Sequence, residues 1–170
     1  MILRSLRHPM AILNMRSLLL NMVASLASER LLLTLWVGSL LAIAYLAVPM
    51  AFATLGDVTL AGNYAGKLFS AVNLLGLGCG LVLLLAKFIT YGKQAVKFWR
   101  FWVLLAMMIL TLVFSYYLQP EIAEIKQGIS QGNDVLTSRF ELFHKISTNL
   151  FIILTLLGLS LVVSTDKVAD

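Results

Sequence analysis

The residue best suited to chemistry in this sequence is His144, at the beginning of the last long apolar segment. Its imidazole can ligate a metal ion or exchange a proton near neutral pH. Five other polar residues are expected at the same level: Arg139, Glu141, Ser147, Lys67 and Asp57. An ionisable cluster at the mouth of a membrane bundle is a candidate for binding a solute. The simpler interpretation is a hydrogen-bonding network that sets the register of the helices.

Few other residues in this chain could ligate a metal or take part in a redox reaction. A metal centre needs several ligands at suitable spacing, and His144 has no second histidine nearby. His8 belongs to the N-terminal arm, on the opposite side of the expected topology, so a haem held by two histidines of one chain is not predicted. The single cysteine, Cys79, excludes dithiol exchange. No nucleophile and base pair is recognisable, so an enzyme and a bound cofactor are not expected, and a metal or haem at His144 stays an alternative.

Long helices within a lipid bilayer must position these residues. The chain has 170 residues, of which 60% are hydrophobic and only 12% charged, too few to cover a soluble domain of this size. Apolar segments occupy residues 31–55, 66–89, 98–118 and 146–163, each near the roughly 20 residues that a spanning helix needs. Isolated strands are excluded because lipid cannot satisfy their backbone groups. The sequence predicts an all-α integral membrane four-helix bundle over residues 31–163.

The sequence also predicts the structure of the segments outside the four spans. In residues 1–28, polar residues recur at helical spacing on an otherwise apolar stretch, which predicts a basic amphipathic helix on the membrane surface. The alternatives are a signal peptide, a fifth spanning helix, which would leave almost no turn before Leu31, and a true start at a later methionine. Residues 119–145 are predicted to form a partly helical outer loop. At its beginning, Pro120 is expected to end or kink the third helix. Residues 164–170 form a short tail.

Charge placement predicts the orientation. With both termini in the cytoplasm, the inside holds Arg4, Arg7, Arg16, Arg30, Lys87, Lys93, Lys97, Arg100 and Lys167, and the outside holds Lys67, Lys126, Arg139 and Lys145. Basic residues favour the cytoplasmic side, so a bacterial inner-membrane protein with both termini inside is expected. The net charge of +5 then reflects these loops rather than nucleic-acid binding.

Small residues and a proline indicate how the helices pack. Gly62 and Gly66 are four residues apart, as are Gly76 and Gly80, which lets neighbouring backbones approach closely. Pro49 lies inside the first span and predicts a kink, because its ring displaces the backbone bond to Tyr45.

Three local patterns together resemble a known family. They are WVGSLLAIAYLAVPMAF at 36–52, AGNYAGKLFSAVN at 61–73 and RFELFHKIS at 139–147. In this order they resemble four-pass membrane proteins that include eukaryotic transmembrane protein 205 and a bacterial domain of unknown function. The resemblance implies four spans and the family positions Gly38, Pro49, Phe52, Gly62, Gly66, Phe69, Arg139, Phe140, His144 and Ser147. It also implies a link to metals or porphyrins, while Phe151 stands where the family pattern leads us to expect asparagine.

Two functions follow as hypotheses. The first is a non-enzymatic membrane protein that binds or helps move a small solute, with a metal or porphyrin among the candidates, near His144. The second is a structural or accessory subunit of a larger membrane complex. The glycine-rich helix faces favour this hypothesis. The expected partners are the lipid bilayer and either further copies of the chain or other membrane proteins, and no nucleic acid.

Overall fold

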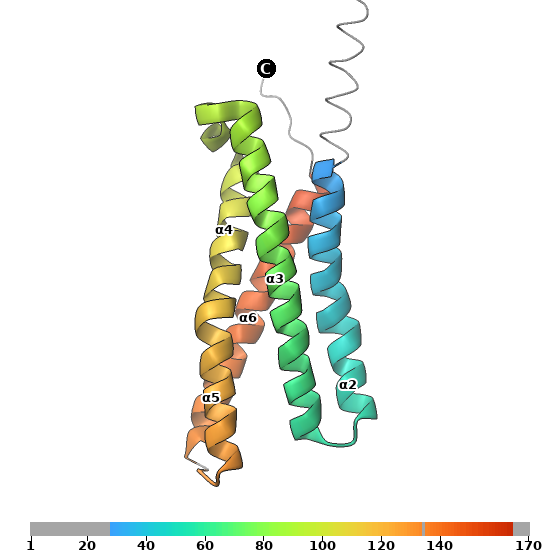
Figure 1. Cartoon of the computed structure of the whole chain (residues 1–170), viewed down its shortest axis with the longest axis vertical. Helices are drawn as coiled ribbons and strands as arrows, with labels where there is room; N and C mark the ends of the chain where they lie inside the picture. Colours follow the sequence, from blue (N-terminus) through green and yellow to red (C-terminus); the bar gives the residue numbers. More distant parts are fainter. Residues whose placement is uncertain (1–27, 134, 165–170) are drawn as a thin grey trace, which may run out of the picture.

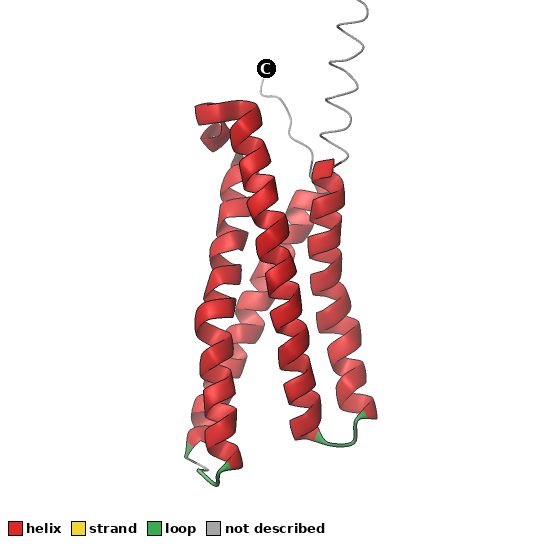
Figure 2. Ribbon diagram, in the orientation of Figure 1, coloured by secondary structure: helices red, strands yellow, loops and turns green. Residues whose placement is uncertain are grey.

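The protein is built from long, nearly parallel and antiparallel helices, as the composition predicts. The computed structural model describes residues 28–133 and 135–164, so most of the expected N-terminal arm and the C-terminal tail lie outside the described residues. Figure 2 shows helices joined by short loops within these ranges. Four helices are long and apolar enough to cross a membrane: Ser28–Thr54, Val58–Lys97, Trp99–Ser130 and Leu136–Val163. The described part of the chain is therefore all-α, with the composition of a multi-pass membrane protein.

Each long helix except the last is subdivided. The first helix, Ser28–Thr54, contains the π-helix η1 (Ile43–Ala47) and ends with α2 (Val48–Thr54). The second consists of α3 (Val58–Tyr91) and the 3₁₀ segment η2 (Gly92–Lys97). The third joins α4 (Trp99–Val113), the π-helix η3 (Phe114–Leu118) and α5 (Gln119–Ser130), and the fourth is α6 (Leu136–Val163).

The bundle has two distinct ends. The turn at residues 55–57, the end of α5 and the beginning of α6 lie at one end, which we name the Asp57 end (bottom of Figure 1). Ser28, η2 and the last residues of α6 lie at the other, which we name the Arg100 end. Consecutive helices therefore run in alternating directions.

Both prolines among the described residues follow a π-helical turn. Pro49 and Pro120 occupy the second positions of α2 and α5, directly after η1 and η3. A proline ring has no N–H and clashes with the carbonyl four residues before it. Widening the preceding turn to π geometry moves that carbonyl away and gives the displaced carbonyls other donors. The helices consequently continue through both prolines, and residues 119–130 and 136–145 are helical.

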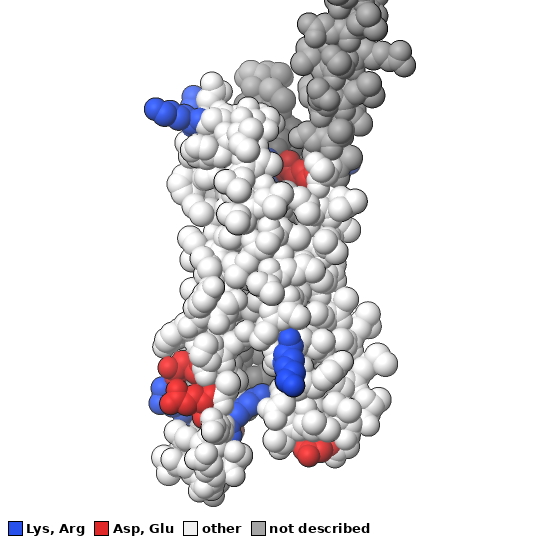
Figure 3. Space-filling model, viewed as in Figure 1, with Lys and Arg blue, Asp and Glu red and all other residues white. Residues whose placement is uncertain are grey.

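The core lies at mid-height and toward the Arg100 end, where all four long helices meet. Trp36, Leu40, Leu104, Met107 and Leu154 are fully buried there. Large apolar side chains on the outside of every long helix remain exposed. Figure 3 shows charged side chains gathered toward the two ends of the visible face, with an uncharged band between them. Such a surface is typical of a multi-pass membrane protein, whose middle lies in lipid.

Candidate functional site

The helices separate into two pairs toward the Asp57 end. There α2 packs against α3, whereas α5 packs against α6. In Figure 1, α6 crosses behind the bundle from the first helix at the Arg100 end to α5 at the Asp57 end. Figure 3 shows the result as a hollow between the two pairs, with Lys or Arg side chains at its edge. We call this hollow the Asp57-end cleft.

Small residues of α3 form one wall of the cleft. Gly62, Gly66 and Ser70 follow each other at intervals of four and share one face of the helix. Lys126 Nζ on α5 donates to the backbone oxygen of Gly62 at 3.1 Å. One turn beyond Gly66, Ser70 Oγ donates to Gln119 Oε1 at 3.2 Å. These two bridges tie α3 to α5 on either side of Gly66.

The space at Gly66 between the two bridges is open. A Cβ atom built on Gly66 would have no heavy atom of another residue within 4 Å, and the residue is exposed. A Cβ on Gly62, in contrast, would lie 3.3 Å from Lys126 Nζ. We call this opening the Gly66 window. It is a gap between two helices that polar contacts hold at a defined spacing.

One face of α6 forms the opposite wall. The rings of Phe140 and His144 are stacked, with centroids 5.8 Å apart and an interplanar angle of 14°. Lys126 Nζ lies 5.9 Å from the centre of the Phe140 ring. Deeper in the bundle, Phe151 meets Phe69 of α3 edge-to-face at 5.3 Å. The cleft is therefore polar at its mouth and aromatic at its floor.

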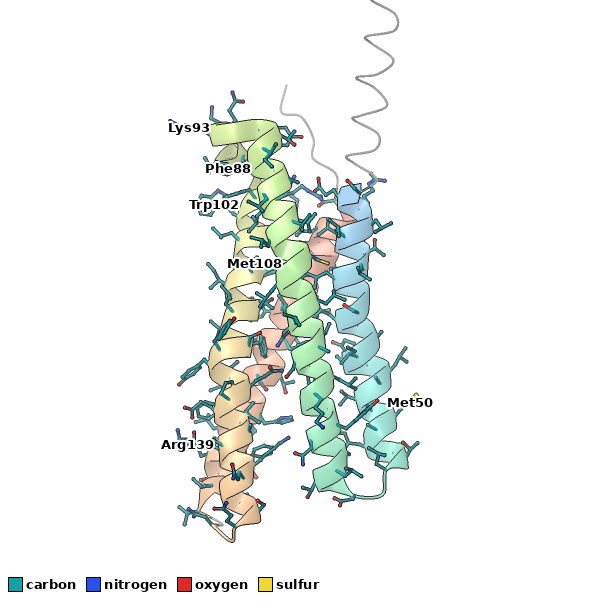
Figure 4. All side chains as sticks on the ribbon, viewed as in Figure 1. Met50, Phe88, Lys93, Trp102, Met108 and Arg139 are labelled. Atoms are coloured by element: carbon teal, nitrogen blue, oxygen red, sulfur yellow. The ribbon has the colours of Figure 1, made fainter. Side chains whose placement is uncertain are left out.

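The predicted polar cluster is only partly brought together. His144 is exposed and shares a helix face with Phe140 and Ser147, whose Oγ donates to the His144 backbone oxygen at 2.9 Å. Arg139 instead pairs with Glu121 at 3.0 Å, and Figure 4 shows it on the α5–α6 side, away from α3. Glu141 and Lys67 are exposed.

Asp57 has a structural role at the start of α3. Its Oδ1 accepts from the backbone N–H groups of Thr59 at 2.7 Å and Leu60 at 3.2 Å. This is an N-cap, which satisfies two of the backbone donors that a helix start leaves without partners. The geometry therefore accounts for Asp57 without a ligand.

Lys126 and Gln119 are the cleft residues that sequence reasoning missed. Lys126 was counted as one of several surface charges of the outer region. The available signal was the spacing of Gln119 and Lys126, seven residues apart and so on one face of a predicted helix. Among the described residues, no carboxylate lies within ion-pair distance of Lys126. Gln119 Nε2 is buried without a hydrogen-bond partner in the same part of the chain.

A second ionic cluster closes the Arg100 end. Glu29 Oε1 lies 3.0 Å from Arg100 Nη2 and 3.4 Å from Lys87 Nζ, and both basic residues are almost fully buried. Arg100 Nη1 also donates to Leu161 O at 3.0 Å and to Ser164 Oγ at 2.9 Å, at the C-terminus of α6. A cation is favourable at that end of a helix. The cluster joins the first helix, α3, α4 and α6, and Glu29 was not singled out from the sequence.

Four of the glycines singled out from the sequence fall into two groups. A Cβ on Gly76 would meet the Trp36 ring, and one on Gly80 would meet the Met108 side chain. A Cβ on Gly38 or Gly66 would have no such neighbour within 4 Å. Gly76 and Gly80 thus lie at a close helix crossing, and the other two border open space.

The described residues contain no group of three or more His, Cys, Asp or Glu side chains able to hold a metal ion. Residues 31–131 match the family model of a domain of unknown function, DUF4149, which covers more than half of the chain. The chain belongs to the DUF4149 family. The matched region of this DUF4149 protein includes Gly62, Gly66 and Lys126 and ends before α6. No curated protein and no solved structure gives a significant match to it.

Proposed function

We propose that this DUF4149 protein binds a small organic solute in the Asp57-end cleft, with the Gly66 window as the entry and the Phe140–His144 stack as one wall. The observation that carries the proposal is the open space at Gly66, held between two polar bridges and exposed at the surface. Concave sites with a few polar groups on an apolar wall are typical of small-molecule binding. A porphyrin, which the family resemblance suggests, has a flat ring suited to such a stack. A bare metal ion finds no ligand set among the described residues.

In this proposal the protein lies in a bacterial inner membrane with both termini in the cytoplasm and the cleft facing outward. The distribution of basic residues supports that orientation. The resemblance to eukaryotic transmembrane protein 205 belongs to the proposal as well, since it depends on the loose patterns quoted above.

The orientation predicts which engineered cysteines react from outside. Gln127 lies on α5 near the Asp57 end and Gln94 on η2 near the Arg100 end, and both side chains are exposed. With Cys79 replaced by alanine, Gln127→Cys should react with an impermeant thiol reagent on intact cells, and Gln94→Cys only after lysis. Labelling of position 94 but not position 127 on intact cells would reverse the topology.

His144→Ala tests the solute site. Because His144 is exposed, we expect the variant to keep the yield and thermal stability of the wild type. Native mass spectrometry in mild detergent should show a small molecule that accompanies the wild type and is lost from His144→Ala. The neighbouring exposed residue provides the control, and Lys145→Ala should retain the molecule. The proposal would be wrong if His144→Ala were unstable and no small molecule accompanied the wild type.

A second function, as an accessory subunit, is favoured by one surface. An apolar groove of about 720 Å³ runs along the outer face of the first helix, and its lining residues are Arg30, Leu31, Thr34, Leu35, Gly38, Ser39 and Ala42. Small residues four apart allow another helix to approach closely in lipid. Association with another membrane protein through this groove is the alternative that a stable, empty wild type would support.

A further inference from the structure

We infer that the solute of the Asp57-end cleft is an amphiphile with one anionic head group, which Lys126 binds, and an apolar chain that runs past Gly66 toward Phe69 and Phe151. This inference rests on the proposed binding function and specifies the chemical class of the ligand.

The charge arrangement on α5 points to an anionic head group. Glu121 pairs with Arg139, and Glu124 is two residues from Lys126, on the opposite side of the helix. Lys126 therefore faces the cleft while both glutamates of α5 face elsewhere. Its ammonium group has three donors, and one of them is used by the backbone oxygen of Gly62.

Burial makes an anionic partner favourable for Lys126. The side chain is partly buried between α3 and α6 and lies against the Phe140 ring. A cation removed from water loses hydration that a neutral carbonyl replaces only in part. A carboxylate or phosphate oxygen would use the remaining donors, in a charge-assisted hydrogen bond stronger than a neutral one.

The order of residues along the cleft predicts an apolar body attached to that head. Lys126 lies eight residues past η3, about 12 Å farther along the helix axis toward the Asp57 end. Moving inward along α3, Gly62 is followed by the open Gly66 and then by Phe69, which meets Phe151. Phe151 in turn meets Phe114, with ring centroids 6.1 Å apart. Apart from the Ser70–Gln119 bridge, the lining therefore changes from polar at the mouth to aromatic farther in. An amphiphile that lies in one leaflet of a bilayer changes polarity in the same direction.

Binding of matched single-chain probes to the full chain tests this inference. The protein is placed in nanodiscs of phosphatidylcholine, and its affinity is measured for palmitate, hexadecyl phosphate, hexadecanol and hexadecyltrimethylammonium. Loss of one charged hydrogen bond corresponds to roughly 10- to 100-fold in affinity. We expect palmitate or hexadecyl phosphate to bind that much more tightly than hexadecanol, and the cationic probe to bind most weakly.

Two variants connect that preference to the cleft. Lys126→Met keeps the length of the side chain and should abolish the preference for the anionic probes, whereas Lys93→Met, which removes an exposed lysine of η2 at the Arg100 end, should leave it unchanged. Gly66→Leu should block all probes, because its side chain fills the window. Adding phosphatidylglycerol to the discs distinguishes two sources of the head group. If phosphatidylglycerol displaces palmitate, the cleft binds a membrane lipid. If it does not, the cleft binds a free single-chain acid. Both results agree with an anionic head group.

The negative results separate the inference from the proposed function. If hexadecanol binds as tightly as palmitate and Gly66→Leu blocks both, the head-group assignment is overturned while solute binding in the cleft stands. If the anionic probes bind and neither Lys126→Met nor Gly66→Leu changes their affinity, they bind elsewhere and the inference is overturned. If no probe binds, the inference is overturned, and the co-purified molecule in the His144→Ala experiment decides the proposed function independently.

Discussion

Replacing Glu29 with glutamine is expected to lower the free energy of unfolding by about 3 kcal/mol, since removing one partner of a buried ionic cluster leaves charge behind in a low-dielectric site. Glu29 Oε1 is shared by Arg100 at 3.0 Å and Lys87 at 3.4 Å, and these side chains are 5% and 4% exposed. Without the carboxylate, the two buried cations lose the anionic partner that they share. The loss should appear as a lower unfolding midpoint of the purified protein in a single detergent.

A matched control is available at the opposite end of the bundle. The Arg139–Glu121 pair has the same 3.0 Å separation, but its side chains are 54% and 30% exposed. Ion pairs in contact with solvent contribute about 0 to 1 kcal/mol, so Glu121→Gln should change stability by less than that amount. Equal effects of Glu29→Gln and Glu121→Gln would show that the Arg100-end cluster does not hold the four helices together.

Gly76→Leu should be the most disruptive of the glycine substitutions. A Cβ at this position would lie 2.8 Å from Trp36 Cε2 and in contact with the indole nitrogen. Trp36 is fully buried, so its ring has no free space to move into. Overpacking a dense core costs about 1–3 kcal/mol and occasionally more, and a leucine against a fixed indole belongs at the upper end of that range. The measurement is again the unfolding midpoint, alongside the yield of folded protein.

Two other glycines provide the comparison. Gly38→Leu and Gly66→Leu introduce side chains where the Cβ has no heavy-atom neighbour within 4 Å. Both replace glycine inside a helix, where leucine is preferred by somewhat under 1 kcal/mol, so their stability should stay equal to the wild type or rise slightly. If Gly38→Leu were as damaging as Gly76→Leu, the close crossing at Trp36 would not explain the result.

The sequence by itself determined the number and nature of the long helices. An apolar run of spanning length is a local property of the chain, and lipid leaves a helix as the way to satisfy its backbone. It also identified His144 with Phe140 and Ser147, because residues four and seven apart share a helix face. Pro120 was recognised as a perturbation of the third helix.

Only the tertiary structure decided which side chains of different helices meet. Lys126 contacts Gly62 across 64 positions of sequence, and Arg100 contacts Glu29 across 71. Such contacts depend on the rotation and crossing of whole helices, and periodicity within one helix carries no information on either. Likewise, Pro49 marks a perturbed turn in the first helix, but the local pattern did not show that this turn is π-helical over Ile43–Ala47.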